Sequence, residues 1–292
     1  MGEADTELEA AYRLCARQVR QSAGNFYYAF RLLPFEKRRG LHSLYRFCRG
    51  ADDLADGGGS PERRLAALAG YRLALDRTLA GNPPDRGWLT LLDTVGRFQL
   101  DSRHLHEVID GCALDCSPLV IDSEADLASY CYGVAGVVGL LSARIFRYRD
   151  QRVEGMAVAL GEAMQRTNIL RDIAEDLAAG RRYLPRQTLD EFGVEDQDLR
   201  AGPRGPRAPA YRRLMAHEVE LARERFATGL RLVPLVERDA RGCPAALAAL
   251  YRQLLAVMEA RDYDVQLERV SLSSRRKVIL ALGAWVTATL RP

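Results

Sequence analysis

Asp52 and Asp56 stand four residues apart near the end of the stretch "LYRFCRGADDLAD". On an α-helix this spacing puts both carboxylates on one face, where like charges repel each other by roughly a few tenths of a kcal/mol. Tyr45 and Arg49 fall on the same narrow line at 100° per residue, and apolar residues flank it. Such a line is either a solvent-facing strip or a place where a bound partner offsets the repulsion.

A second polar stripe lies in "EAMQRTNILRDIAEDLAAGRRYLP", residues 162–185. Gln165, Asn168, Asp172 and Asp176 share one face of the expected helix, and apolar residues occupy the rest of its circumference. Two amides with two aspartates differ from the Glu and Lys mixture of solvated helices, so this stripe is predicted to face inward. Buried carboxylates without lysine partners indicate a bound cation.

The ligand types narrow the choice of cation. Carboxylate and amide oxygens without a cluster of His or Cys suit Mg²⁺, with Mn²⁺ as the alternative, and Mg²⁺ completes its shell with water and substrate phosphate. Arg49 and Arg171 stand beside the acids, where guanidinium groups would face anionic oxygens. We therefore predict metal ions that bridge the carboxylates to a diphosphate. The sequence lacks the ExxH pairing of ferritin-like bundles and the glycine-rich loops of ATP-dependent phosphoryl transfer.

Two further stretches are candidates for the lining of a substrate cavity. "NFYYAF" (25–30) and "YCYGVAGVVGLL" (130–141) combine aromatic rings, whose faces stabilise cations, with small residues that leave space between helices. Ordinary core packing is the alternative for each of these residues. A metal-held diphosphate beside an aromatic, water-poor cavity predicts ionisation of an allylic diphosphate to a carbocation.

The elements that position these residues are predicted to be helices throughout, which makes the protein all-α. Apolar residues recur at helical spacing along nearly the whole chain, and no alternation long enough for a strand occurs. The first stripe lies on a helix that ends at Gly57–Gly59, and Ser60 and Pro61 begin the next one. Further helices are expected near residues 62–80, 102–114, 124–147, 151–179, 211–236, 244–262 and 272–290. An exposed loop without a domain boundary is expected at 201–210, so residues 1–292 are predicted to form a single domain.

Composition excludes several classes of function. The net charge is +3, from 42 basic and 39 acidic residues among 292, so the chain lacks the electrostatic footprint of a nucleic-acid-binding protein. Its six cysteines show no paired CxxC spacing, which favours a reducing compartment. Without a secretory signal or an apolar run long enough to span a bilayer, the protein is predicted to be cytoplasmic. The apolar stretches 133–143 and 278–290 are predicted to be buried helices, and the second leaves a peripheral membrane contact open.

The chain resembles the squalene/phytoene synthase family from about Cys15 to Leu290. The resemblance rests on "FYYAFRLLP", "LYRFCRGADDLAD" and "QRTNILRDIAEDLAAGRRYLP", and two DxxxD motifs in this context are specific. It implies an isoprenoid-synthase helical bundle with a central cavity, which joins two isoprenoid diphosphates head to head. The metal ligands that it implies are Asp52, Asp56, Asn168, Asp172 and Asp176. The substrate-binding residues that it implies are Tyr45, Arg49, Gln165 and Arg171 for the diphosphates, and Phe26, Tyr132 and Tyr183 for the cavity. The four aspartates and Tyr132 are its expected catalytic residues.

Within the family, "FYYAFRLLP" followed by "ADDLAD" is most similar to bacterial presqualene diphosphate synthases. The resemblance implies condensation of two farnesyl diphosphates with Mg²⁺, without NADPH, and squalene-pathway enzymes downstream. The alternatives are phytoene from geranylgeranyl diphosphate, squalene, hydroxysqualene, or no enzyme at all but a helical assembly subunit with a vestigial metal site. Three features depart from the family pattern: Asn25, Arg166 in a usually apolar position, and "DYDVQ" at 262–266.

Overall fold

The computed structural model describes residues 3–117 and 119–290, and these form helices joined by short loops. No strand occurs among the described residues, so the all-α prediction is confirmed. The elements in chain order are α1 (Glu3–Ser22), α2 (Asn25–Phe30), α3 (Phe35–Ala55), α4 (Pro61–Leu79), α5 (Arg86–Phe98), α6 (Ser102–Leu114), α7 (Glu124–Cys131), the π-helix η1 (Tyr132–Gly136), α8 (Val137–Phe146), α9 (Arg152–Ala178), α10 (Arg186–Phe192), α11 (Asp196–Ala201), α12 (Ala208–Gly229), the 3₁₀-helix η2 (Leu230–Leu232), α13 (Gly242–Ala260) and α14 (Ser274–Leu290).

Side chains in the loops set where several helices begin. The hydroxyl of Ser60 accepts a hydrogen bond from the backbone N–H of Arg63, and Pro61 occupies the first position of α4. Ser123 and Asp126 form a reciprocal capping box at the start of α7. The predicted boundary between the helix of the first stripe and the next helix is therefore confirmed at Ser60.

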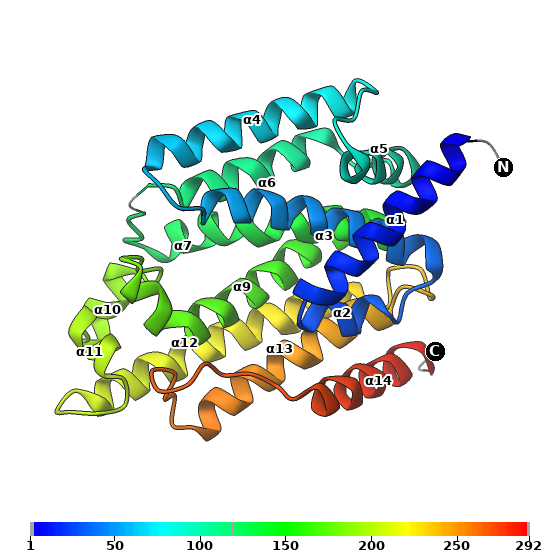
Figure 1. Cartoon of the computed structure of the whole chain (residues 1–292). Coiled ribbons are helices and arrows are strands. Elements are labelled where there is room, and N and C mark those ends of the chain that lie inside the picture. Colours follow the sequence, from blue (N-terminus) through cyan, green and yellow to red (C-terminus); the bar gives the residue numbers. More distant parts are fainter. Residues whose placement is uncertain (1–2, 118, 291–292) are drawn as a thin grey trace.

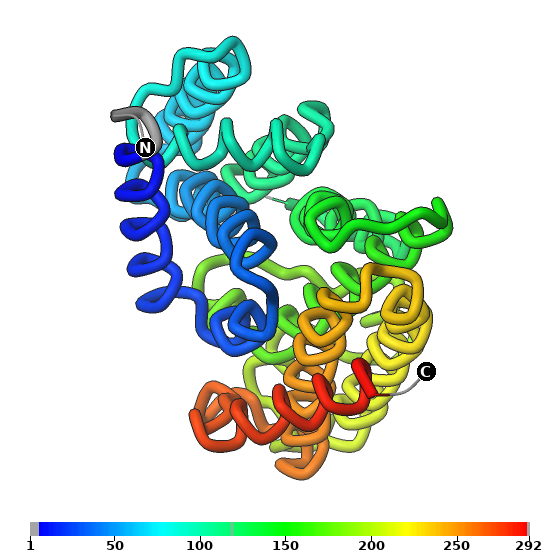
Figure 2. Tube along the Cα trace, turned by 90° about the vertical axis from the view of Figure 1, so that its right-hand side faces the viewer, coloured from blue at the N-terminus to red at the C-terminus, as the bar shows by residue number. Residues whose placement is uncertain are grey.

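The helices are arranged around a central pair, α3 and α9, which carry the two polar stripes. Figure 1 shows α4, α5 and α6 along one edge of the molecule and α12, α13 and α14 along the other. The turned view in Figure 2 likewise separates the blue and cyan helices from the yellow to red ones. Helix α12 packs along α9, and α13 along α14. The buried side chains from Val19 to Ala281 form one contiguous hydrophobic core.

Small residues let the central helices approach each other closely. A Cβ atom on Gly161 of α9 would overlap the carbonyl oxygen of Ala135 in η1, and one on Gly139 of α8 would overlap that of Ala157 in α9. Only glycine fits at such contacts between backbones. Because a π-turn inserts one extra residue into a helix, η1 changes the faces that α7 and α8 present, and π-turns are frequent at functional sites.

Most of the predicted helices are confirmed within a few residues, but the segmentation differs in three places. The helix predicted at 124–147 is divided into α7, the π-helix η1 and α8, which follow one another without a loop. The helix predicted at 211–236 begins earlier, at Ala208, and continues as the 3₁₀-helix η2 from Leu230. The predicted loop at 201–210 is mostly exposed, with the start of α12 inside it. The helices that were not predicted are α1, α2, α5, α10 and α11.

One described helical stretch, Glu124–Phe146, is long and apolar enough to cross a membrane by length and composition alone. Half of its most apolar window is buried inside the protein, and Val134, Ala135 and Val138 line the internal cavity described below. The prediction that residues 133–143 form a buried helix is therefore confirmed. A core helix of this kind passes the same composition test as a membrane span. The same prediction for 278–290 is wrong, because most side chains of that stretch are exposed.

Candidate active site

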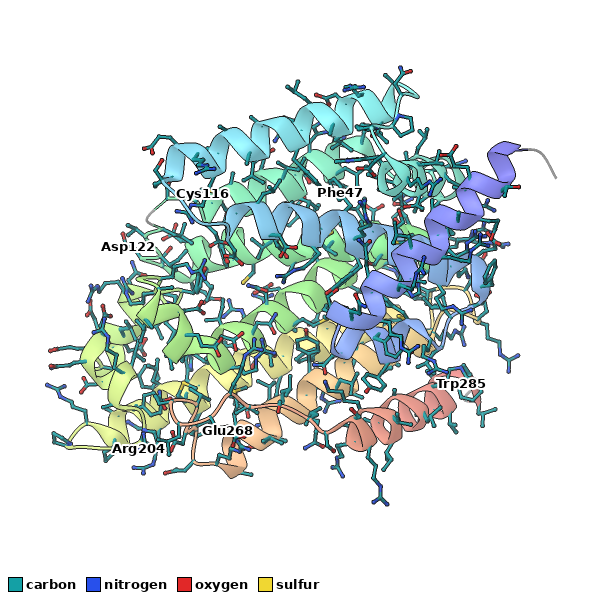
Figure 3. The ribbon with its side chains drawn as sticks, viewed as in Figure 1. Phe47, Cys116, Asp122, Arg204, Glu268 and Trp285 are labelled. Carbon is teal, nitrogen blue, oxygen red and sulfur yellow. The ribbon has the colours of Figure 1, made fainter. Side chains whose placement is uncertain are left out.

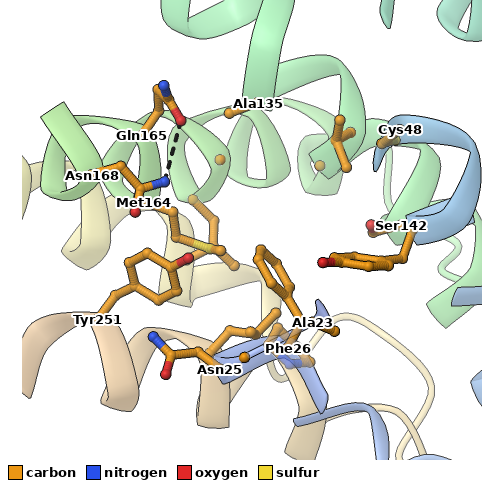
Figure 4. Close-up of a pocket in the computed structure, with 18 of the residues that line it drawn as sticks. Ala23, Asn25, Phe26, Cys48, Ala135, Ser142, Met164, Gln165, Asn168 and Tyr251 are labelled. Atoms are coloured by element: carbon orange, nitrogen blue, oxygen red, sulfur yellow. Dashed lines mark hydrogen bonds between the residues drawn. The ribbon is translucent and has the colours of Figure 1, made fainter. Parts of the chain in front are cut away.

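A cavity of about 480 Å³ lies between α2, α3, α8, α9 and α13 (Figure 4). Most of its wall is apolar and aromatic, and Phe26 stands between Tyr45 and Tyr251 with ring centroids 5.9 and 6.3 Å away. Polar side chains gather where α3 faces α9. Seven of the predicted site residues line this cavity: Phe26, Tyr45, Arg49, Asp52, Gln165, Asn168 and Arg171.

The structure brings the two DxxxD motifs together through one arginine. Arg181, in the loop after α9, places Nη1 3.0 Å from Oδ1 of Asp56 and Nε 3.8 Å from Oδ1 of Asp176. Asp172 has its own cation pair, because Arg269 places Nε 2.9 Å from Oδ1 of Asp172 and Arg171 holds the same carboxylate. These acids therefore gather beside the cavity, and Asp52 is the one among them that lines it. We call this cluster the acid end: Asp52, Asp56, Asp115, Asp172 and Asp176.

Two carboxylates of the acid end, Asp52 and Asp176, have too little positive charge nearby to offset desolvation, and their pKa values are raised. Burial raises the pKa of Asp176 to about 7, although the charge of Arg181 works against this. Asp52 has an exposed side chain and lines the cavity, but the nearby protein atoms still raise its pKa by desolvation; the hydrogen bond from the Cys112 thiol, 3.2 Å away, opposes this. At Asp172 burial is outweighed by hydrogen bonds from Arg171 and Arg269, so its pKa is lowered. An additional cation would be favourable beside Asp52 and Asp176.

Asp115 is a member of the acid end that the sequence did not reveal. It follows α6, and it accepts hydrogen bonds from the hydroxyls of Tyr183 at 2.8 Å and Tyr130 at 3.1 Å, whose rings stack with centroids 4.9 Å apart. Burial raises the pKa of Asp115, the two tyrosine hydroxyls lower it, and the nearby charge of Asp56 raises it. Asp115 is a single acid outside both polar stripes, so no spacing in the sequence marks it as a site residue. Arg181, in contrast, lies within the stretch of residues 162–185 that contains the second stripe.

Two predicted cavity residues lie elsewhere, and both predictions of a place in the cavity wall are wrong. Tyr132 is 39% exposed on the outer side of η1, where its hydroxyl donates to Glu107. Residues two apart on a helix point to different sides, so Tyr130 faces the interior and Tyr132 faces out. Tyr183 is buried, but its hydroxyl is bound to Asp115 beside the acid end and not in the cavity wall.

Three further residues of the cavity wall come from the C-terminal part of the chain. Tyr251 projects from α13 and is buried, Arg269 reaches back from the segment before α14, and Lys277 enters from the first turn of α14. No stripe or motif marks these residues, because each stands alone in its own element. Lys277 is nevertheless one of only two lysines among 42 basic residues.

Comparison with known proteins identifies the protein family. A sequence model of the squalene/phytoene synthases matches residues 19–276. The chain belongs to the squalene/phytoene synthase family. A phytoene synthase of Mycobacterium tuberculosis is 36% identical over 283 residues, which cover 96% of this chain and 92% of that protein. A 15-cis-phytoene synthase of Synechococcus elongatus is 33% identical, with 97% and 95% covered.

Solved structures similar to this squalene/phytoene synthase confirm the isoprenoid-synthase helical fold. A dehydrosqualene synthase in complex with a ligand gives a TM-score of 0.88 at 28% identity, with 99% of this chain and 100% of the other covered. The squalene synthase HpnC of Alicyclobacillus acidocaldarius gives a TM-score of 0.80 at 31% identity, with 88% and 96% covered. The family carries out prenyl transfer between diphosphate substrates.

The departures from the family pattern at Arg166 and Asp262 lie outside the cavity wall. Arg166 points away from the cavity into a buried cluster, with Nε 3.0 Å from Glu162 and Nη1 3.4 Å from Glu218. Asp262 adopts a left-handed backbone conformation with φ of 55°, which explains why glycine is common there. Asn25, in contrast, lines the cavity.

The residues of the acid end fit the divalent cation that the family uses. Among residues 3–117 and 119–290 no three Asp, Glu, His or Cys side chains already stand close enough to hold a metal ion, because arginines pair with Asp56, Asp172 and Asp176. The donor set is nevertheless all oxygen, as Mg²⁺ requires. Oδ1 of Asn168 is buried without a hydrogen-bond partner, which is an unused acceptor at the same place.

Proposed function

We propose that this squalene/phytoene synthase joins two molecules of farnesyl diphosphate head to head and releases presqualene diphosphate and diphosphate. The observation that carries the proposal is the meeting of both DxxxD motifs at Arg181, beside an aromatic cavity that Asp52 lines. The described residues share one hydrophobic core, which supports the further proposal that residues 1–292 act as a single domain.

The two parts of each substrate would bind to different parts of the cavity wall. Arg49, Arg171 and Arg269 present guanidinium groups to the diphosphates, and the prenyl chains lie along the apolar wall. Asp52, Asp56, Asn168, Asp172 and Asp176 would hold Mg²⁺, which would supply positive charge to neutralise the departing diphosphate. Gln165 accepts a hydrogen bond from the Asn168 amide at 3.3 Å, which fixes the orientation of that amide.

The reaction begins when the C1–O bond of one farnesyl diphosphate breaks and its electron pair leaves with the diphosphate, whose charge Arg171 stabilises. The alkene of the second substrate attacks the allylic cation. Loss of one proton to the released diphosphate then closes a cyclopropane. The rings of Phe26, Tyr45 and Tyr251 face the positive charge, and the apolar wall excludes the water that would end the reaction early. These reaction steps need no reductant such as NADPH. An enzyme that consumes presqualene diphosphate would be the downstream partner.

Phytoene synthesis from geranylgeranyl diphosphate is the second candidate. It is favoured by the names of the two relatives above, both of which are phytoene synthases. The two solved structures are named for thirty-carbon products, dehydrosqualene and squalene. The acid end would serve either substrate, since both carry the same diphosphate.

Product analysis by mass spectrometry tests the proposal. The purified protein is incubated with Mg²⁺ and either farnesyl or geranylgeranyl diphosphate, with and without NADPH. We expect a thirty-carbon diphosphate from farnesyl diphosphate without NADPH. A neutral reduced or hydroxylated thirty-carbon product indicates squalene or hydroxysqualene synthesis, and a forty-carbon hydrocarbon alone indicates phytoene synthesis. Binding of a diphosphate analogue without turnover of either substrate would indicate the helical assembly subunit.

Substitution at the acid end tests the roles of the aspartates. Asp52→Ala and Asp172→Ala should each lower turnover at least ~100-fold, because charge stabilisation of the departing diphosphate is lost, while the melting temperature changes little. The control is Asp110→Asn on α6, an exposed acid that pairs only with Arg72 at the surface. Turnover within about twofold of the unchanged protein in either alanine variant contradicts the assignment.

A further inference from the structure

Helix α14 has an apolar outer face that no part of the described chain covers. Its inner side packs on α13 and α2, and Ala281 is its buried residue. At 100° per residue, exposed apolar side chains follow one another around the rest of the helix, from Trp285 at the border with α13 to Leu290 on the far side. The members of this outer face are Val278 (42% exposed), Ile279 (54%), Leu282 (49%), Trp285 (40%), Val286 (43%) and Leu290 (72%).

Positive charge without acidic partners surrounds this face. Arg275, Arg276 and Lys277 occupy the first turn of α14, and Arg238 donates to the carbonyl oxygen of Thr289 at the far end. None of these four forms an ion pair with another described residue: the Arg276 guanidinium donates to Gln253, and Lys277 lies over the ring of Tyr28. Residues 270–292 contain no Asp or Glu. Arg238, Arg275 and Arg276 together with the apolar face form one amphipathic surface, whereas Lys277 turns inward to the cavity wall.

We propose that the outer face of α14 docks on the surface of an anionic lipid bilayer. An apolar helix face lies at the boundary between headgroups and acyl chains, and each nearby Lys or Arg adds attraction to anionic lipid. Trp285, labelled in Figure 3, packs against Gly242 at the start of α13 and remains 40% exposed, and tryptophans are common at membrane interfaces. A second copy of the chain fits less well, because α14 offers no acid to the basic residues of a partner copy.

The cavity lies next to the proposed membrane-docking helix. Residues 269–272, just before α14, and Lys277 within it belong to the cavity wall, so the cavity borders the same helix. If the proposed function holds, a thirty-carbon product would leave the cavity next to the lipid phase in which it dissolves. The docking itself does not depend on that function, because it follows from the exposed residues alone.

Vesicle binding without substrate tests the docking separately from the reaction. The full chain is sedimented with phosphatidylcholine vesicles that contain phosphatidylglycerol or lack it. We expect binding to the anionic vesicles and a loss of at least about tenfold in the partition coefficient for the double variant Leu282→Asp, Val286→Asp. The control is Leu73→Asp on α4, which is 65% exposed at the opposite edge of the molecule (Figure 1) and should bind like the unchanged protein.

A second pair of variants tests the charge. Arg275→Gln and Arg276→Gln should each weaken binding to anionic vesicles about fivefold and leave the melting temperature unchanged. Failure of the unchanged protein to bind anionic vesicles would overturn the proposal. Equal binding by the double aspartate variant would do so too, as would a mass in solution showing a dimer that this variant breaks apart. Product formation is measured in parallel in detergent, and it should be the same in all of these variants.

Discussion

A buried arginine with three acidic neighbours is the least expected feature at the scale of single residues. Arg166 on α9 contacts Glu162, Glu218 on α12 and Glu124 on α7, so it ties three helices together behind the cavity. Oε1 of Glu218 is buried without a hydrogen-bond partner. Burial raises the pKa of Glu218 to about 7, even though Arg166 lowers it. The cluster therefore positions α9 but keeps one carboxylate in an unfavourable place.

Replacing this carboxylate should make the protein less sensitive to pH. Because the folded-state pKa of Glu218 is raised above its value of 4.5 in the unfolded chain, stability is lost as pH rises from 4.5 to about 7. Glu218→Gln cannot ionise, so its stability relative to the unchanged protein should increase by roughly 2 kcal/mol between pH 5.5 and 8. Urea unfolding at both pH values measures the difference.

The matched control for this measurement lies on the same helix. Glu220 of α12 is 63% exposed and pairs with Arg223 at the surface, so Glu220→Gln should show no comparable pH-dependent difference. If Glu218→Gln and Glu220→Gln respond to pH alike, burial of Glu218 does not control the pH dependence.

Spacing along a helix predicted some site residues, whereas the family resemblance misplaced Tyr132 and Tyr183. The stripes put Asp52, Gln165 and Asn168 on the right faces, because position around a helix follows directly from residue number. Spacing cannot decide between Tyr130 and Tyr132 without knowing where η1 interrupts the helix. Asp115 was missed because its tyrosine partners are distant in sequence.

The cavity depends on close backbone contacts at the scale of elements. Gly161 of α9 lies against Ala135 of η1, and both residues line the cavity. Gly155, two turns earlier on α9, has open space where a Cβ would be. The same helix therefore offers one glycine that the packing requires and one that it does not.

Alanine at these two positions should have opposite effects on stability. Gly161→Ala must push η1 away from α9 and should lower the free energy of unfolding by about 1–3 kcal/mol. It should also reduce turnover, since the cavity wall moves. Gly155→Ala should raise the free energy of unfolding by about 0.5–1 kcal/mol, because alanine favours the helix. Denaturant unfolding of both variants checks this, and equal effects would mean that the η1 contact does not limit the packing.

Elements with clear caps and apolar periodicity could be predicted, and others could not. Ser60 and Pro61 fixed the start of α4 to one residue. Helix α5 was missed although Asp85 caps it, because its two glycines and the preceding prolines resemble a loop. The start of α12 at Ala208, inside a segment rich in Pro and Gly, depends on packing that sequence periodicity does not show.

At the scale of the whole molecule, the two stripes come from separate halves of the chain. Helix α3 belongs to the half that contains α1 to α6, and α9 packs with α12 and α13. Arg181, in the loop after α9, connects the two stripes because it pairs with both Asp56 and Asp176, whereas Arg269 pairs with Asp172 and Glu175 of α9 alone. A ligand that binds all of the acids at once would therefore contact both halves of the molecule. It would bind more tightly than to either half alone, and it would stabilise their association.

Thermal unfolding should show this coupling. Mg²⁺ and inorganic diphosphate added together should raise the melting temperature by roughly 5 °C at saturating concentrations, because a ligand that binds only the folded chain stabilises it. Mg²⁺ alone should change the melting temperature little, because Asp56 and Asp176 are already paired with Arg181. Diphosphate alone should also change it little, because the negative charge of the aspartates repels it. Asp176→Asn should abolish the combined rise, whereas Asp110→Asn on the outer surface of α6 should retain it. A full rise with diphosphate alone would mean that the arginines bind it without metal, and the acid end would then need another explanation.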